Sequence, residues 1–368
     1  MHVKRSVDRV AIDPVSRRVH NAWLDWLRFF AAFEVVLTHA RTMLFVEYAQ
    51  LDPASHTLPV MLWTAVTRLG YEAVMVFFVL SGFLVGGPAL QRSLERRFSL
   101  PDYFIDRVVR IMVPLVGAIV FSLIAAMVVR MPLSPVTVIG NLLSLQGAFV
   151  EVLPINFPLW SLSYEVWFYV IGGAVAFMLT RRAPSFLAAL ALVAAAIIFA
   201  QLLVGYLLLW FGGAAAYLYR PRRMSVVQVI IGAALVFGGI LAYQLSLPRT
   251  GTPDPYRPGQ GLGGALMLFG LAVVLPNLRA SNWTAGRLAQ IGTFFASFSY
   301  SLYLIHMPVL EMWPIRDMTS VTPAATGAYA AAVFTALIAA FIFSRCFETT
   351  GPRIKAFLRE RRRSSVSR

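Results

Sequence analysis

The stretch that decides the fold is FLAALALVAAAIIFAQLLVGYLLLWFGGAAAYLY, residues 186–219, which runs for 34 residues without a charged side chain. A transmembrane helix needs about 20 apolar residues, so this stretch is too long for one crossing and short for two. Gln201 and Gly205 mark the natural point for a turn within it. We interpret the stretch as two short helices, at 186–201 and 204–219.

Comparable apolar stretches recur along the whole chain of 368 residues, of which 58% are hydrophobic and only 13% charged. A soluble protein of this length would carry nearly twice that share of charge. The pattern predicts an all-α, polytopic membrane helix bundle of about ten transmembrane helices. The other eight are expected near 23–45, 70–90, 111–129, 159–179, 225–245, 261–276, 293–313 and 324–345.

The positions of Lys and Arg orient this bundle, because cytoplasmic flanks of transmembrane helices are enriched in both. With N- and C-termini cytoplasmic, the inner segments hold 25 of the 32 Lys and Arg residues and the outer segments hold 6. A single helix at 186–219 would move Arg220, Arg222 and Arg223 outside, so the charges favour ten spans. We therefore expect a multi-pass protein of the cell inner (plasma) membrane.

Three regions follow from this topology: a basic N-terminal segment at 1–22, a transmembrane domain at 23–345 and a basic tail at 346–368. The net charge of +15 is then mostly a matter of orientation, with the tail suited to anionic headgroups of membrane lipid. The chain has no basic patch interleaved with aromatic residues, so no nucleic-acid partner is predicted. Cys346 is the single cysteine, so no disulfide within the chain is possible and no metal site is expected.

Ionisable residues inside the predicted spans are costly and usually face the interior of a bundle. The first span carries Arg28 and His39, eleven residues apart and therefore on nearly one helix face. Arg28 is expected to pair with Asp25 one turn away. In the fourth span, Glu165 is expected at a depth similar to that of His39, where it would orient the imidazole of a general base. The alternative for each residue is a structural role.

A second group of polar residues is expected at the inner ends of the helices. Arg107 and Arg110 lie one turn apart near the start of the third span, and such a pair suits phosphate binding. The same two residues also fit positive-inside topology without any ligand.

The sequence resembles the acyltransferase-3 family of integral membrane O-acyltransferases. The resemblance rests on five motifs in order: LDWLR (24–28) with VVLTH (35–39), FFVLSGF (77–83), DRVVRIMVP (106–114), WSLSYEVWFY (160–169) and SYSLYLIH (299–306). Members of this family transfer an acyl group, usually acetyl from acetyl-CoA, to a hydroxyl of a carbohydrate or related acceptor. The resemblance implies that Arg28 and His39 are required for activity.

On this basis we expect acyl-CoA and a carbohydrate or lipid-linked glycan acceptor as the partners of the site. The catalytic residues expected are His39, Glu165 and Arg28; the substrate-binding residues expected are Arg107, Arg110, Ser161, Ser163, Tyr169, Tyr303 and His306. Direct transfer by His39 is favoured over a covalent relay through Ser163 or Tyr303, because neither lies in a motif for an activated nucleophile. A transporter or exporter with a buried proton relay is the alternative class.

Overall fold

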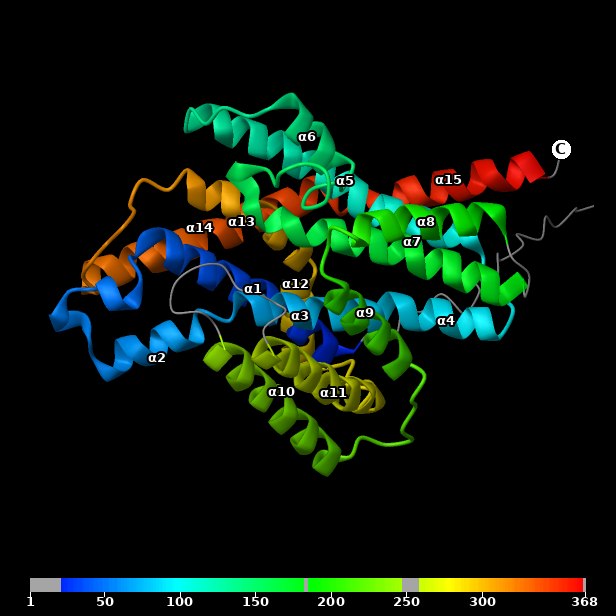
Figure 1. Cartoon of the computed structure of the whole chain (residues 1–368), viewed down its shortest axis with the longest axis horizontal. Helices are drawn as coiled ribbons and strands as arrows, with labels where there is room; N and C mark the ends of the chain where they lie inside the picture. Colours follow the sequence, from blue (N-terminus) through cyan, green and yellow to red (C-terminus); the bar gives the residue numbers. More distant parts are fainter. Residues whose placement is uncertain (1–20, 182–184, 247–257, 367–368) are drawn as a thin grey trace, which may run out of the picture.

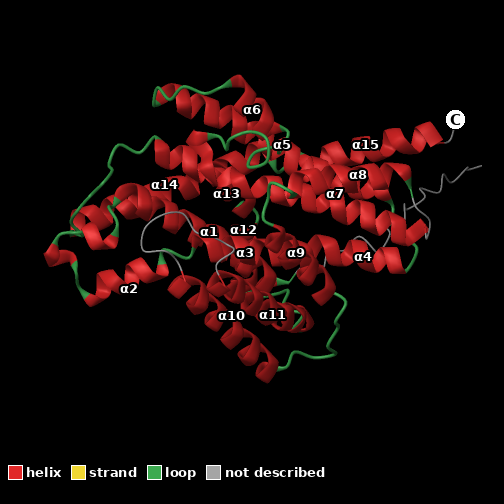
Figure 2. Cartoon of the chain, in the orientation of Figure 1, coloured by secondary structure: helices red, strands yellow, loops and turns green. Residues whose placement is uncertain are grey.

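The computed structural model describes residues 21–181, 185–246 and 258–366, and throughout these residues the chain forms helices and loops without a β-strand. Figure 2 shows the helices packed side by side along one long axis. This arrangement confirms the all-α bundle predicted from the apolar periodicity. Residues 1–20 of the predicted N-terminal segment lie outside the described residues.

Each of the ten predicted spans coincides with a helix or with a run of consecutive helices. The bundle helices are α1 (Ala22–Leu44), α3 (Gly70–Ser81) with the π-helical turn Gly82–Gly86 and α4 (Gly87–Leu94), α5 (Leu100–Val128), α7 (Trp160–Arg181), α8 (Phe186–Phe199), α9 (Val204–Ala216), α10 (Val226–Ser246), α11 (Pro258–Ala280), α12 (Arg287–Ala296) with α13 (Ser299–Glu311), and α14 (Pro323–Phe347). Two short helices, α2 (Leu58–Val66) and α6 (Pro135–Leu142), lie in connections, and α15 (Gly351–Val366) follows the bundle.

By length and composition, six helical segments of the described chain can cross a membrane, or seven if the bent pair α12 and α13 is one span. Helix α1 is long enough at 23 residues but carries Asp25, Arg28, Glu34 and Arg41. Helices α8 and α9 are apolar but have only 14 and 13 residues. The chain is thus a multi-pass membrane protein, and the number of ten crossings stays a prediction.

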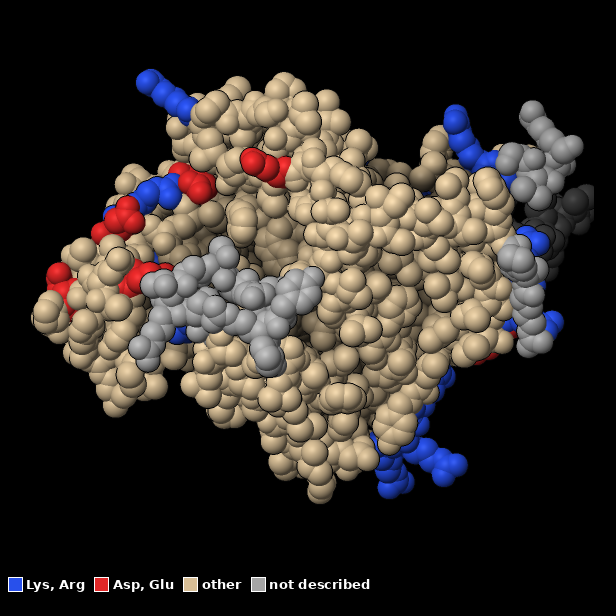
Figure 3. All heavy atoms as spheres, in the orientation of Figure 1, with Lys and Arg blue, Asp and Glu red and all other residues tan. Residues whose placement is uncertain are grey.

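The bundle helices alternate in direction, so the helix termini gather at two ends of the molecule (Figure 1). The start of α1 packs on the end of α11, where Asn21 donates to the Leu278 carbonyl at 2.9 Å. The opposite end of α1 pairs with the chain between α13 and α14 through Met318. Figure 3 shows Asp and Glu mostly near α2 and the loop after α13, and Lys and Arg mostly at the other end.

Two glycines allow α3 and α9 to approach closely. A Cβ at Gly213 would lie 2.1 Å from the Val79 carbonyl oxygen, and one at Gly82 would lie 1.9 Å from that of Trp210. Small residues at helix crossings in membranes let backbones touch in this way. The contact fixes α9, although it is short, against the centre of the bundle.

The helix pair α12 and α13 bends by 50°, whereas the sequence predicts one continuous span at 293–313.

Within α13, Pro308 has no N–H to bond the Leu304 carbonyl. Asn156 fills this gap from the turn before α7, since its Nδ2 donates to Leu304 O at 2.8 Å and to Ser122 Oγ at 3.0 Å. A buried polar contact therefore joins α5, α7 and α13.

The predicted basic tail is a helix packed along α5. Asp106 forms ion pairs with Lys355 at 3.3 Å and Arg359 at 3.0 Å, and Arg362 pairs with Asp102 at 2.8 Å. Lys355, Arg359 and Arg362 are therefore paired with carboxylates of α5, so only part of the positive charge of the tail remains for anionic lipid headgroups.

Candidate active site

Two histidines from opposite ends of the sequence meet inside the bundle. Nδ1 of His39 on α1 lies 3.0 Å from Nε2 of His306 on α13, and the ring planes are inclined by only 24°. His306 is fully buried, whereas His39 keeps part of its surface accessible. The first and the late histidine motifs of the sequence therefore form one unit.

Backbone carbonyls determine which nitrogen of His306 carries the proton. Its Nδ1 lies 3.0 Å from the Leu302 oxygen and 2.9 Å from the Tyr303 oxygen. Carbonyl oxygens only accept hydrogen bonds, so Nδ1 must be the donor and Nε2 of the neutral ring an acceptor. His39 then donates from Nδ1, which leaves the lone pair on its Nε2 for chemistry.

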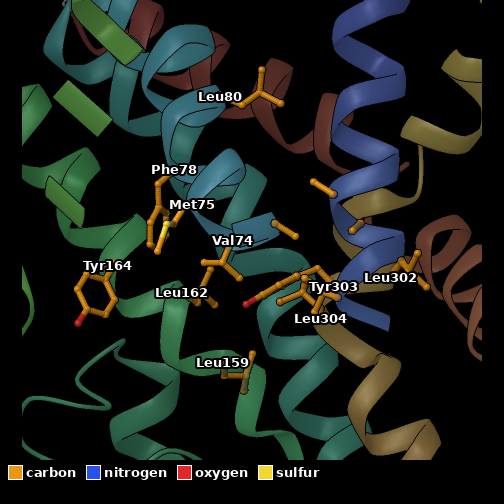
Figure 4. Packing of buried hydrophobic residues seen from close by; sticks show 14 of the residues in the cluster. Val74, Met75, Phe78, Leu80, Leu159, Leu162, Tyr164, Leu302, Tyr303 and Leu304 are labelled. Atoms are coloured by element: carbon orange, nitrogen blue, oxygen red, sulfur yellow. The ribbon is translucent and has the colours of Figure 1, made fainter. Parts of the chain in front are cut away.

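Tyr303 lies one turn before His306 and points toward α7 (Figure 4). Its hydroxyl donates to the Pro158 carbonyl at 2.9 Å and shares a short hydrogen bond of 2.5 Å with Ser161. Ser163, which is 1% exposed, donates to the Trp160 carbonyl at 3.0 Å. These three hydroxyls are buried and their protons are held by main-chain or neighbouring oxygens.

Glu165 has a different partner from the one expected from the sequence. Its Oε1 accepts a 2.5 Å hydrogen bond from Tyr169, one turn further along α7, and the ring of His39 is held by His306 instead. The Tyr169 hydroxyl also lies 3.0 Å from Ser81 on α3. No hydrogen bond between Glu165 and His39 is formed in the described structure, since matched depth on two helices does not make them face each other, and the orienting role of Glu165 stays a prediction.

Arg107 and Arg110, near the start of α5, contact two different groups of polar side chains. The guanidinium of Arg107 lies over the Tyr169 ring, 5.7 Å from its centroid, and Tyr169 is hydrogen-bonded to Glu165. Arg110 forms an ion pair of 2.6 Å with Glu348, whose other oxygen accepts from the Ser301 hydroxyl at 2.6 Å. Arg107 and Arg110 are both partly exposed, whereas the Glu348 side chain is only 6% exposed.

Arg28 lies near the start of α1 and pairs with Asp25 at 3.4 Å, as the three-residue spacing predicts. Asp25 also accepts a hydrogen bond from Thr293 on α12 at 3.3 Å. The Arg28 side chain is 30% exposed, so its guanidinium keeps an accessible surface. All ten sequence-predicted site residues thus lie on α1, α5, α7 and α13, where α13 contacts each of the other three and α5 also contacts α7.

This geometry agrees with a comparison against family models. The model of the acyltransferase-3 family, which describes an acyltransferase domain, matches residues 21–345. The chain belongs to this family. Comparisons with curated proteins and with solved structures gave no match. Family membership makes the protein a membrane acyltransferase, with an acyl donor and an acceptor as substrates, rather than the transporter considered as the alternative.

Sequence reasoning missed Glu348, whose carboxylate pairs with Arg110, one of the predicted site residues. Glu348 is the first acidic residue after the last span and one of only two carboxylates in the basic tail, and this is the signal that would have identified it. Within the described residues, no group of three His, Cys, Asp or Glu side chains is arranged to hold a metal ion. His39, His306 and the arginines are the groups from which a mechanism can be built.

Proposed function

We propose that this acyltransferase moves an acetyl or other acyl group from acyl-CoA to a hydroxyl of a carbohydrate or lipid-linked glycan, with His39 as general base. The observation that carries the proposal is the hydrogen bond between His39 and His306. It leaves Nε2 of His39 unprotonated, as a general base requires, on a residue that is partly exposed.

The reaction is a direct transfer. Nε2 of His39 takes the proton of the acceptor hydroxyl while that oxygen attacks the thioester carbonyl carbon. The C–O bond of the ester forms, the C–S bond breaks, and the sulfur leaves with the bonding electrons. The imidazolium of His39 then returns its proton to the thiolate, so the products are an O-acyl ester and free CoA. His306 accepts from Nδ1 throughout and keeps the ring in one orientation.

The covalent alternative has less support from the contacts of its candidate nucleophiles. Tyr303 and Ser163 both donate their hydroxyl protons to main-chain carbonyls, at 2.9 Å and 3.0 Å. A serine or tyrosine nucleophile needs a base beside its hydroxyl instead. We assign Tyr303, Ser161 and Ser163 to the wall of the reaction cavity, with Tyr169 between them and the donor end.

The donor is expected to enter at the end where Arg107, Arg110 and Arg28 lie. CoA carries several phosphates, and partly exposed guanidinium groups bind phosphate oxygens in bidentate pairs. This end also carries most of the Lys and Arg on the face drawn in Figure 3, so it is proposed to face the cytoplasm of a cell inner membrane. Arg110 must exchange Glu348 for a phosphate when the donor binds.

Release of free thiol tests this function. Protein purified in detergent is mixed with acetyl-CoA, and thiol is measured with and without a panel of polysaccharides and lipid-linked glycans. Thiol release that depends on an acceptor and is lost in His39→Ala supports the proposal. Full turnover in a folded His39→Ala variant would exclude His39 as the base, and no thiol release with any acceptor would count against the CoA donor or the glycan acceptor.

A further inference from the structure

A cavity lies apart from the histidine pair, since neither His39 nor His306 lines it. It has a volume of about 140 Å³ and is formed where α3, α7 and α9 begin and α10 ends. Its lining is almost wholly aromatic and includes Trp160 and four tyrosines, Tyr71, Tyr164, Tyr206 and Tyr243. We call these five residues the aromatic pocket.

The aromatic pocket and the reaction centre lie on two sides of the start of α7. Trp160 lines the pocket, whereas the next residue, Ser161, bonds Tyr303 on the other side. Figure 4 shows Tyr164 directed away from α7 on the side opposite to Tyr303. Tyr303 in turn lies against His306, with ring centroids 6.0 Å apart. A ligand bound in the aromatic pocket would therefore lie near Tyr303 and the histidine pair without overlapping the proposed site of the reaction.

The rings of the pocket hold one another in fixed positions. The Tyr206 ring lies 5.2 Å from that of Tyr164 at 85° and 5.8 Å from that of Trp160 at 39°. Trp160 is also 6.2 Å from Tyr71. The Tyr164 hydroxyl accepts from the Leu203 N–H at 3.0 Å, which fixes the first turn of α9 against α7. The ring faces are thus preorganised before any ligand arrives.

The other tyrosine hydroxyls of the pocket have no hydrogen-bond partner among the residues that the structure describes. Tyr206 is 8% exposed and Tyr243 is 2% exposed, yet in the described part of the chain neither hydroxyl, nor that of Tyr71, makes a hydrogen bond to protein. None of the three is among the buried polar atoms without a hydrogen-bond partner. Hydroxyls of nearly buried residues normally have a hydrogen-bond partner, so a ligand that carries hydroxyl groups suits these three positions.

A buried acid with one unpartnered oxygen lies next to the pocket, at the contact of α3 with α10. Glu72 follows Tyr71, Gln244 follows Tyr243, and Gln244 Nε2 donates to Glu72 Oε1 at 2.5 Å. The second carboxylate oxygen of Glu72 and the amide oxygen of Gln244 are buried without a hydrogen-bond partner among the described residues. Glu72 is only 2% exposed. Acceptors of this kind suit a ligand or water that donates hydrogen bonds.

We propose that the aromatic pocket is a subsite for one pyranose ring of the acceptor, a ring other than the one whose hydroxyl is acylated. A pyranose offers C–H faces to aromatic rings and hydroxyls to the unpaired oxygens, whereas a lipid chain or an apolar ring would leave those oxygens unsatisfied. A cavity of about 140 Å³ is close to the ~150 Å³ that holds one benzene ring, so it has room for a single six-membered ring. The inference rests on the proposed carbohydrate acceptor.

Direct binding tests the subsite without any reaction. Saturation-transfer difference NMR on the protein in lipid nanodiscs measures the affinity for methyl β-D-glucopyranoside and methyl β-D-galactopyranoside, with toluene as the apolar probe. At least one glycoside is expected to bind. Tyr206→Leu, which removes a ring face and a hydroxyl, is expected to weaken that binding by tenfold or more, and Tyr206→Phe by about threefold to tenfold. Tyr219→Phe is the matched control, because Tyr219 is 51% exposed and outside the pocket, and its affinity should equal wild type.

Binding of toluene but of neither glycoside would overturn the subsite, as would glycoside affinity that is unchanged in Tyr206→Leu. His39→Ala keeps the pocket and should bind the glycoside as wild type does. Because binding is read without CoA, glycoside binding in a protein that never releases thiol would reject the acyl-CoA reaction and leave the subsite standing. Thiol release without pocket-dependent glycoside binding would reject the subsite and leave the acyl-CoA reaction standing.

Discussion

Nδ1 of His39 and Nε2 of His306 are joined by a 3.0 Å hydrogen bond across 267 positions of sequence. The carbonyls of Leu302 and Tyr303 fix the proton of His306 on Nδ1, at 3.0 Å and 2.9 Å. One backbone turn of α13 therefore determines which nitrogen of a ring on α1 is free to act as a base. In the proposed reaction, His306 is an uncharged orienting group in the position that a carboxylate has in many hydrolases.

The first prediction concerns this tautomer. Nitrogen NMR of protein labelled at histidine should show the proton of the neutral His39 ring on Nδ1 and none on Nε2. The chain has five histidines, so the His39 signals are assigned by their loss in His39→Gln. A protonated Nε2 on the neutral His39 ring would contradict the proposed direction of the hydrogen bond.

The second prediction separates positioning from packing at His306. His306→Leu removes the acceptor for the His39 proton while keeping an apolar side chain in a fully buried place. We expect kcat to fall by about 10–100-fold with little change in KM for acetyl-CoA, since a general base contributes about 10²–10⁴-fold and loses part of that when misoriented. His306→Gln supplies an acceptor oxygen and should recover part of kcat. Equal losses in the two variants would indicate a packing role alone.

The third prediction concerns the donor end. Glu348→Gln removes the charge that holds Arg110 in a 2.6 Å ion pair and keeps a similar shape. If Arg110 binds a phosphate of the donor, its release should lower KM for acetyl-CoA by about twofold to tenfold, the range of one typical hydrogen bond. Arg110→Gln should raise KM.

Arg345→Gln is the control for this pair, because Arg345 is exposed and contacts the Phe341 ring. It removes the same charge near the same end of α14 and should leave KM unchanged. A KM that does not respond to Arg110→Gln would remove Arg110 from the donor site and leave it as a structural partner of Glu348.

The fourth prediction concerns the crossing of α3 and α9. Gly213→Ala places a methyl group 2.1 Å from the Val79 carbonyl oxygen, so the two helices must separate. We expect a loss of about 1–3 kcal/mol in stability, measured as a lower midpoint of thermal unfolding in detergent. Gly238→Ala is the control: nothing lies within 4 Å of its added Cβ, and alanine favours a helix by up to about 1 kcal/mol. Similar midpoints for the two variants would contradict the close approach.

Much of the fold follows from the sequence, because the cost of exposing polar backbone to lipid makes each long apolar stretch a helix. The turn expected at Gln201 and Gly205 lies between the end of α8 at Phe199 and the start of α9 at Val204. The third span was predicted to begin at 111, whereas α5 begins at Leu100. The first three turns of α5 carry Asp102, Asp106 and Arg107 and precede the apolar stretch. A prediction based on hydropathy therefore starts the helix too late.

The sequence predicted which residues belong to the candidate site better than it predicted which of them contact each other. Helical spacing alone places Arg28 beside Asp25, and the structure has that ion pair. The partner of His39 depends on how α1, α7 and α13 pack, which no local periodicity records. For the same reason Glu165 was expected beside His39 but bonds Tyr169 four residues away on its own helix.

The central claim is that His39, held by His306, is the base of an acyl transfer from CoA. Its most direct test is the initial rate at which radiolabelled acetyl-CoA esterifies glycans in inverted membrane vesicles, compared at equal folded protein for wild type and His39→Ala. We predict that label enters an alkali-labile ester with wild type and that the rate falls by about 10²–10⁴-fold in His39→Ala. Esterification by His39→Ala at the wild-type rate would contradict this account.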